Sequence, residues 1–437
     1  MAWRKPLLFS VVLFCATAQR GLGVDVAPPL PQQPAADALE LRALVQEALE
    51  RNPEIQAARR TIEAKRARIP QARAWPDPTV SVSYGGNLLP PFTVMNGDPS
   101  SARQFMAEQE IPYPGKTRLR GEIAAREADA ETLAYEATWR RIVAEVKQAY
   151  FDLYLTDRSL SVLRQDRELL EKFAQVAEIR YSVGKAAQQD VLRAQVELSR
   201  LLERQTVLEQ TRRTLEAQLN SLRDRPVDMP IGSPAELRPT PLAQSLEDLQ
   251  AAAEASYPRL KREHALVEGE RLAVELARKE VRPNFTLGYT YMQRAGLPDM
   301  YGITFSTSLP IFRRSKQDQA IAEAAANLES ERRMEANERA VLRYRVKQEY
   351  LQAQAAEQLL KLYAQGIVPQ STLALEASLS SYETGATDFL TVLSNFTTVL
   401  DYELGYDQQL ATHEKTLARL EELTGLNLTP QQEVRGE

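Results

Sequence analysis

Side chains that carry out chemistry are scarce in this chain of 437 residues. It has two histidines, His264 and His413, and one cysteine, Cys15. The sequence contains no Ser/His/Asp arrangement, no His-Glu-x-x-His motif, no Cys-x-x-Cys pair and no phosphate-binding glycine loop. The two histidines are far apart in the sequence, and each is expected on the surface of a helix rather than at a metal ion. We therefore predict that the protein is not an enzyme and has no cofactor and no metal site.

The charge pattern gives no reason to propose nucleic acid as a partner. The net charge is −5, and both signs are interspersed along the chain. Pairs such as Arg59-Arg60 and Arg212-Arg213 lie among glutamates at helical spacing, which is typical of solvated helix faces.

The first eighteen residues have the pattern of a secretory signal peptide (1–18). Arg4 and Lys5 precede a short apolar run, and Ala16-Thr17-Ala18 forms a small-residue cleavage site. A lipoprotein signal would instead make Cys15 the lipidated first residue, although the bulky Phe14 before it disfavours this alternative. Later segments do not approach the ~18 apolar residues of a membrane-spanning helix. We expect an exported bacterial protein without such a helix.

Internal repeats indicate two copies of one unit. Three groups of residues recur in the same order at a nearly constant offset. Asn52-Pro53-Glu54-Ile55 recurs as Tyr257-Pro258-Arg259-Leu260, Val146-Lys147-Gln148-x-Tyr150 as Val346-Lys347-Gln348-x-Tyr350, and Tyr181-x-x-Gly184 as Tyr382-x-x-Gly385. The predicted organisation is a signal peptide (1–18), an irregular tail (19–38), the first repeat (39–225), a Pro-rich linker (226–243), the second repeat (244–426) and a C-terminal tail (427–437).

Each copy is predicted to begin with one helix, over 39–74 and over 244–281. Two short alternating segments follow, and then a very long helical stretch that is broken once at a Tyr-x-x-Gly tip. Residues 115–225 contain no proline, which at ~1.5 Å per residue leaves room for helices near ~100 Å long. Apolar residues at heptad spacing along 191–222 predict a coiled-coil partner for this segment.

Four alternating segments predict strands with one apolar and one polar face: 79–85, 104–111, 284–291 and 301–309. Aromatic and β-branched residues on one face and small polar residues on the other are typical of a barrel wall between lipid and water. A small soluble sheet packed on helices is the alternative, but the flanking helices are too long to fold back over it. Four strands cannot close a barrel, so two chains would supply eight strands and three would supply twelve.

The order of elements resembles the TolC-like outer-membrane efflux protein family over roughly 39–426. It is similar in detail at Asn52-Pro53-Glu54-Ile55, Gln109-Glu110-Ile111-Pro112-Tyr113-Pro114-Gly115-Lys116, Tyr181-x-x-Gly184 with Asp190-Val191-Leu192, and Leu309-Pro310-Ile311-Phe312. The resemblance implies a mainly α fold with a transmembrane β-barrel, built as a homotrimer with twelve strands and a helical tunnel in the periplasm. The implied location is the outer membrane, and the implied partners are its lipid, a periplasmic adaptor (membrane fusion) protein and an inner-membrane pump. The segment 109–120 is most similar to channels that serve heavy-metal or cation pumps of the resistance-nodulation-division type.

Two groups of candidate site residues follow from the resemblance. The first is the pair of tips, where small residues would let adaptor hairpins dock closely; it comprises Tyr181, Ser182, Gly184, Ala186, Tyr382, Gly385, Ala386 and Thr387. The second is a candidate pore gate, in which a ring of carboxylates would attract cations; it comprises Asp190, Asp388, Thr391 and Ser394. Some family members carry acidic residues where this chain has Thr391 and Ser394, so Asp190 and Asp388 are the acidic candidates. A role as helix N-terminal carboxylates is the alternative for both.

Other functions stay open on these patterns. A type I protein-secretion channel would share the fold, because the pore is a passive conduit. A periplasmic coiled-coil scaffold, or the adaptor itself, would share the long helices, but an adaptor would lack the duplication. Which substrate the channel carries is not determined by the sequence patterns.

Overall fold

The computed structural model describes residues 39–86 and 93–429. The predicted signal peptide with Cys15, the tail 19–38 and residues 430–437 of the C-terminal tail lie outside the described residues. The cleavage site, the lipidation alternative and the exact domain boundaries therefore stay predictions.

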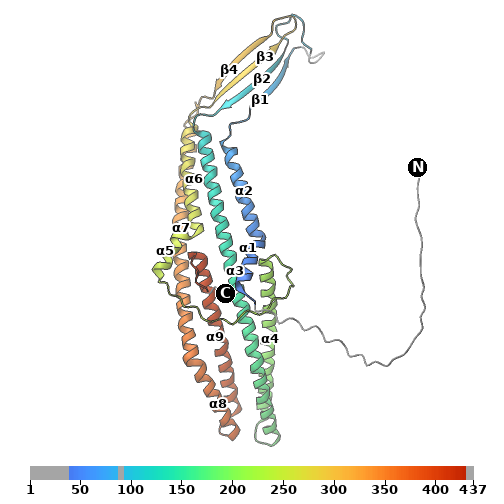
Figure 1. The fold of residues 1–437 in the computed structure, drawn as a ribbon, viewed down its shortest axis with the longest axis vertical. Coiled ribbons are helices and arrows are strands. Elements are labelled where there is room, and N and C mark those ends of the chain that lie inside the picture. The colour runs from blue at the N-terminus through green and yellow to red at the C-terminus, as the bar shows by residue number, and fades with distance from the viewer. Residues whose placement is uncertain (1–38, 87–92, 430–437) are drawn as a thin grey trace, which may run out of the picture. The chain divides into compact units, whose positions relative to one another are not determined.

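The elements run twice through the same order of two helices, two strands and a long helical hairpin. The first run is α1 (Leu41–Arg51), α2 (Pro53–Arg73), β1 (Thr79–Gly85), β2 (Ala102–Ile111), α3 (Lys116–Ser182) and α4 (Gln188–Leu222). The second is α5 (Leu246–Ser256), α6 (Pro258–Glu280), β3 (Phe285–Gln293), β4 (Met300–Thr307), α7 (Gln317–Leu362), the π-helical turn η1 (Tyr363–Ile367), α8 (Val368–Thr384) and α9 (Phe389–Thr424). In Figure 1 the strands form one sheet at one end of the helices, and the two hairpin tips lie at the other end. The duplicated, mainly helical fold is confirmed.

The prediction of a single helix at the start of each copy is wrong, and for the same reason in both. Pro53 and Pro258 lack a backbone N–H, and a proline ring forces the residue before it out of the helical conformation. Asn52 and Tyr257 accordingly have extended ψ angles of 123° and 117°. Each predicted helix is therefore divided into two, α1 with α2 and α5 with α6.

The long helices pack through the predicted heptad seam. α3 has 67 residues, which at ~1.5 Å per residue gives a length of about 100 Å. Four seam residues of α4 are buried in the core: Ala194, Leu201, Leu215 and Leu219. Arg212 occupies a polar position of the seam, where its guanidinium contacts the Asp157 carboxylate of α3 at 2.7 Å. The seam thus joins α3 and α4 into one hairpin.

The second hairpin is interrupted where α7 passes into α8. The π-helical turn η1 ends just before Pro369, the second residue of α8. One wide turn absorbs the missing N–H and the bulk of the proline ring without ending the helix. The Tyr363 side chain packs over Gly405 of α9, where an added Cβ would lie 3.1 Å from the phenol oxygen. The helix is therefore irregular just before Pro369 but continues to the second tip.

The sheet has the order β1-β2-β3-β4, and all neighbours are antiparallel. Its register places the aromatic residues, valines, leucine and isoleucines of the four strands on one face, because Val82 pairs with Phe105, Phe105 with Tyr291, and Tyr291 with Tyr301. The next residues along each strand form the opposite face, where Ser83 pairs with Gln104. The predicted alternation is therefore confirmed in every strand. Among the described helices, none is long and apolar enough to cross a membrane.

Candidate functional site

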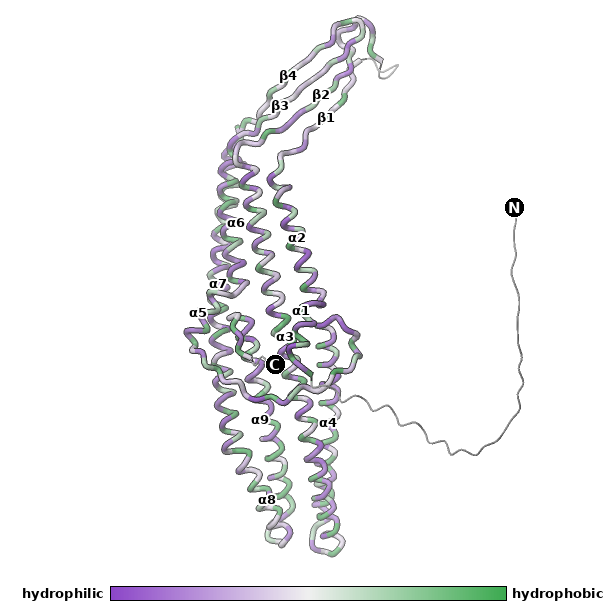
Figure 2. Tube along the Cα trace, viewed as in Figure 1, coloured by the Kyte–Doolittle hydropathy of each residue, from purple (hydrophilic) through white to green (hydrophobic). Residues whose placement is uncertain are grey.

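The apolar face of the sheet is uncovered in the subunit. Ile303 is 80% exposed, Val80 is 73% exposed, and Phe305 is 66% exposed. Apolar and polar residues alternate along the strands (Figure 2), and the helices lie beyond one end of the sheet rather than over it (Figure 1). The alternative of a soluble sheet packed on helices is therefore wrong for this part of the chain. Such a face fits lipid, because aromatic and aliphatic side chains are stable there.

Both edges of the sheet are open in the subunit. β1 and β4 are the outermost strands, and within the described residues each is paired on one side only. Unpaired N–H and C=O groups are not tolerated in lipid, because no water is present to satisfy them. In lipid, such a sheet would need further strands to pair with both of its edges.

A buried lysine joins the sheet to the helices. Lys116, at the start of α3, is 2% exposed, and its ammonium group lies 2.8 Å from the Glu280 carboxylate and 2.7 Å from the carbonyl oxygen of Arg282. It also donates to the side-chain oxygen of Asn284 at 2.8 Å. Burial alone would raise the pKa of Glu280, but Lys116 and Arg120 outweigh it and hold that pKa below its ordinary value. The network thus ties the start of α3 to the end of α6 and to the residues between α6 and β3.

Both tips reverse the chain at a glycine with positive φ. Gly184 has a φ of 71° and Gly385 a φ of 81°, a conformation that other residues adopt at a cost. The amide of Ala386 donates to the carbonyl of Ser381 at 2.8 Å, and in the first tip the amide of Lys185 likewise donates to the carbonyl of Arg180 at 2.8 Å. The expected helix-end role of the glycines is thus present at both tips.

The other candidate docking residues surround these turns. Ser182 donates to the carbonyl of Ile179 at 2.7 Å, Ala186 is half-buried, and Ala386 is exposed, while Thr387 is half-buried. These residues are small, but the first tip also exposes the larger side chains of Val183 and Lys185. Docking of an adaptor at these residues stays a prediction.

The two tip tyrosines differ in the exposed fraction of their side chains. An arginine that the sequence analysis did not include among the site residues explains the difference. Tyr181 is 45% exposed, whereas Tyr382 is 6% exposed. The Arg180 guanidinium lies 4.5 Å from the centroid of the Tyr382 ring and also donates to the Tyr382 carbonyl oxygen. The second copy has Ser381 at the position of Arg180, so comparison of the two copies could have identified this bridge between the tips.

The candidate gate residues lie beyond the tips in the first turns of α4 and α9. The Asp388 carboxylate accepts hydrogen bonds from the backbone N–H of Thr391 at 2.9 Å and from its hydroxyl at 2.6 Å. These bonds lower the pKa of Asp388 and make it the N-cap of α9. Asp190 is half-buried in the first turn of α4, and Ser394 is exposed. Asp388 and Thr391 are therefore in direct contact. Asp388 has the helix-capping role that the sequence analysis gave as the alternative to a pore gate.

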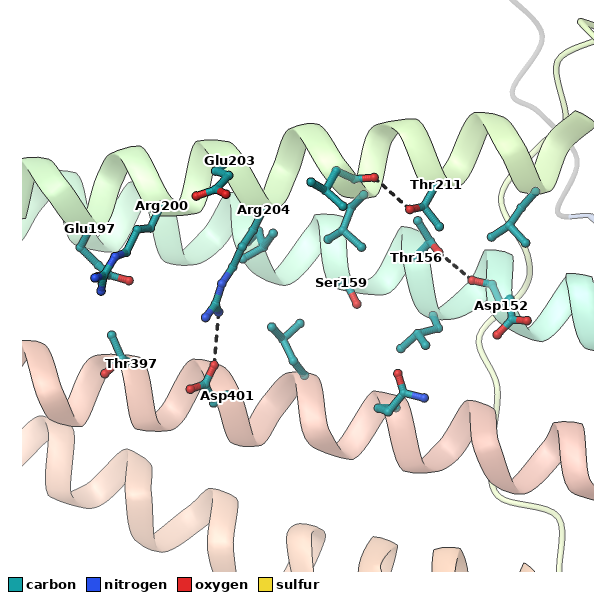
Figure 3. Close-up of a pocket in the computed structure, with 17 residues that line it drawn as sticks. Asp152, Thr156, Ser159, Glu197, Arg200, Glu203, Arg204, Thr211, Thr397 and Asp401 are labelled. Atoms are coloured by element: carbon teal, nitrogen blue, oxygen red, sulfur yellow. Dashed lines mark hydrogen bonds and ion pairs between the residues drawn. The ribbon is translucent and has the colours of Figure 1, made fainter. Parts of the chain in front are cut away.

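A groove separates the two hairpins of one subunit. It has a volume of about 1070 Å³ and lies between α4 and α9, with α3 along its side (Figure 3). An ion pair between Arg204 and Asp401 crosses it at 3.2 Å. Exposed pairs of this kind contribute about 0–1 kcal/mol. This ion pair therefore adds little to the joint between the hairpins, which share a buried apolar core formed by residues of α3, α4, α8 and α9.

Acidic side chains meet at the contact between α3 and α9, opposite the π-helical turn. Burial and the nearby Glu403 raise the pKa of Asp166 from 3.8 to about 7. Burial also raises the pKa of Asp407 to about 6, although Arg158, 3.4 Å from its carboxylate, opposes the change. A cavity of about 310 Å³ lies between Arg158, Asp407 and Pro369.

The histidine prediction is right for one residue and wrong for the other. His264 is exposed on α6, 3.7 Å from the Glu335 carboxylate. His413 is fully buried, with Nε2 2.7 Å from the carbonyl oxygen of Thr240 and Nδ1 3.3 Å from that of Ala353. His413 lies under the linker between the two copies, and no sequence pattern indicates where that linker packs. No group of three or more His, Cys, Asp or Glu side chains in residues 39–86 and 93–429 is placed to hold a metal ion.

Comparison with known proteins gives consistent matches. A family model described as outer membrane efflux protein matches residues 44–223. The chain is 26% identical over 412 residues to the cobalt-zinc-cadmium resistance protein CzcC of Cupriavidus metallidurans, covering 90% of this chain and 91% of that protein. The fold is similar to that of a membrane protein from Pseudomonas aeruginosa (TM-score 0.77, 19% identity, 91% and 99% coverage). It is also similar to that of CusC, a protein described as forming a transmembrane channel (TM-score 0.76, 15% identity, 91% and 96% coverage).

Proposed function

Because a model of the outer membrane efflux protein family matches residues 44–223, and a metal-resistance protein is similar along 90% of the chain, we propose that the protein is the outer-membrane exit duct of a tripartite efflux system whose cargo is divalent metal cations. The protein is an efflux channel and not an enzyme. It would carry its cargo passively, driven by an inner-membrane pump.

The observation that carries the proposal is the uncovered apolar face of a sheet with two open edges. Three copies would place β4 of each subunit beside β1 of the next and give twelve strands without an edge. Two copies would give eight, and the trimer is favoured here because it is the assembly that the family resemblance implies. The barrel would lie in the outer membrane and the helices in the periplasm.

The cargo is proposed from the relative whose name specifies cobalt, zinc and cadmium resistance. The similarity of residues 109–120 to channels of heavy-metal pumps supports the same choice. A passive duct needs no resident metal site, so the cargo would be selected mainly by the pump.

The tips would meet the periplasmic adaptor. Gly184 and Gly385 allow each hairpin to end in a short turn, and small residues beside them leave space for another helix. In a trimer the two tips would alternate, so the adaptor would meet six similar surfaces. The carboxylates Asp190 and Asp388 would lie just above this junction.

Deletion of the gene from its own bacterium, followed by complementation, tests the proposal. We expect growth to become sensitive to zinc, cobalt or cadmium, and the complemented protein to migrate as a heat-modifiable trimer in outer-membrane fractions. Loss of a secreted protein without metal sensitivity would indicate a type I secretion channel instead. Absence of trimers from the outer membrane would refute the channel altogether.

A further inference from the structure

The polar face of the sheet carries negative charge and no positive charge. The register places these residues on that face: Thr79, Ser81, Ser83, Gly85, Ala102, Gln104, Met106, Glu108, Glu110, Thr286, Gly288, Thr290, Met292, Met300, Gly302, Thr304 and Ser306. Glu108 and Glu110 are its charged members, and no lysine or arginine of β1 to β4 shares the face. Arg103 of β2 has the opposite parity and belongs to the apolar face.

The two glutamates have different surroundings. The Glu110 carboxylate accepts a hydrogen bond from the Asn284 amide at 2.7 Å, and Asn284 in turn accepts one from Lys116 at 2.8 Å. Glu110 is therefore part of the network at the base of the sheet. No hydrogen bond or ion pair to the described residues reaches the Glu108 carboxylate. Its charge is left for water and mobile ions to balance.

Glu108 lies opposite a glycine of the neighbouring strand β3. It pairs with Gly288, which pairs with Thr304 on the next strand. A Cβ added at Gly288 would lie 3.4 Å from the Glu108 Cγ, 3.5 Å from its carboxylate oxygen and 3.4 Å from the Thr304 Cβ. The missing side chain at Gly288 thus lets Glu108 extend along the wall toward Thr304, while Thr304 itself is exposed.

We propose that Glu108 makes the barrel lumen selective for cations. The inference rests on the proposed trimer, in which three Glu108 carboxylates form a belt at one level and three Glu110 carboxylates lie one row away, about 7 Å along the strands. Uncompensated carboxylates raise the local concentration of cations and lower that of anions. The ligands are small monovalent or divalent cations that pass through the barrel. The electrostatic field of these carboxylates extends over about 30 Å at 0.01 M salt but only about 3 Å at 1 M.

The potential beside Glu108 can be measured without passing current through the tips. A cysteine is introduced by Thr304→Cys, in the same row, and its reaction rates with a cationic and an anionic methanethiosulfonate of similar size are compared in the membrane-inserted full chain. The chain's own cysteine, Cys15, lies in the predicted signal peptide and is replaced by Cys15→Ser as a precaution. We expect the cationic reagent to be favoured at 0.01 M salt, and Glu108→Gln to lower the ratio of rates about three- to tenfold.

Two comparisons make the result specific. Glu247→Gln removes an exposed carboxylate from the first turn of α5 and should leave the ratio unchanged. Raising the salt to 1 M without Glu108→Gln should also reduce the preference, because screening weakens the field of fixed charges. A preference that survives at 1 M would contradict its electrostatic origin, even if Glu108→Gln prevents assembly.

An equal ratio with and without the Glu108→Gln substitution, in inserted trimers that react with both reagents, would overturn this inference and leave the channel intact. If neither reagent reached residue 304 in inserted protein, the polar face would not line a water-filled lumen. That result would refute the proposed channel and the selectivity together.

Discussion

Ile303 and Thr304 are adjacent residues on opposite faces of β4, and arginine at each should have opposite consequences. Ile303 lies in the middle row of the apolar face, where it pairs with Tyr289, and Tyr289 pairs with Ala107. β3 has nine residues, so at ~3.3 Å per residue and a tilt of about 40° it covers roughly the 25 Å height of a lipid-facing band. Position 303 is therefore near the midplane of the membrane.

Arginine at the midplane costs about 2–4 kcal/mol per subunit, or about 6–12 kcal/mol for a trimer. That range is comparable with the whole stability of a typical domain, about 5–15 kcal/mol. Ile303→Arg should therefore abolish insertion. Thr304→Arg places the cation in water beside Glu108 and should insert nearly normally.

The assay is the fraction of protein that resists urea extraction and migrates as a heat-modifiable trimer from outer-membrane fractions. Total protein is measured in parallel, so that degradation is not mistaken for failed insertion. Equal damage from the two arginines would show that the faces have been assigned wrongly. Normal insertion of Ile303→Arg would mean that the apolar face does not meet lipid.

Three further variants test other parts of the molecule. Ala386→Trp, beside the second tip turn, should preserve trimers but reduce adaptor crosslinking at least about fivefold, as expected when a contact worth more than ~1 kcal/mol is lost; loss of the trimer itself would argue against docking. Pro369→Ala restores a helical N–H beside η1 and should change the closed-state conductance, whereas unaltered currents would leave the proline with a local role. Burial raises the pKa of Asp166 from 3.8 to about 7, so the folded state binds this proton more tightly and loses stability as pH rises between about 4 and 7. Asp166→Asn should therefore raise the free energy of unfolding at pH 8 by about 1–2 kcal/mol after allowance for solvent, and with it the thermal midpoint, but not at pH 4; an equal gain at both pH values would contradict this reasoning.

The strands and tips were predictable because their signals are local. Period-two alternation identifies the faces of a strand without knowledge of its neighbours, and the pairing of Ile303 with Tyr289 keeps the apolar faces matched. The tip glycines could be identified because a sharp reversal requires positive φ. The breaks before Pro53 and Pro258 were also within reach, since the pre-proline restriction is local.

Two features required information that a helical pattern does not contain. His413 is buried because the irregular linker covers α9, and a segment without periodicity gives no indication of where it packs. The Arg180 contact with Tyr382 joins segments from different copies, so neither segment predicts it alone. Even so, the replacement of Arg180 by Ser381 in the second copy marks a position where the copies have diverged.

The open edges of β1 and β4 have a consequence for biogenesis. A newly exported subunit would display unpaired strand edges and an uncovered aromatic face to the aqueous periplasm, where both favour aggregation. The sheet gains its partners only when the chains meet, so trimer formation and membrane insertion are thermodynamically linked to subunit concentration. The yield of inserted channel should consequently fall more steeply than the supply of chain, and periplasmic chaperones that shield β1 to β4 would set how many subunits survive to assemble.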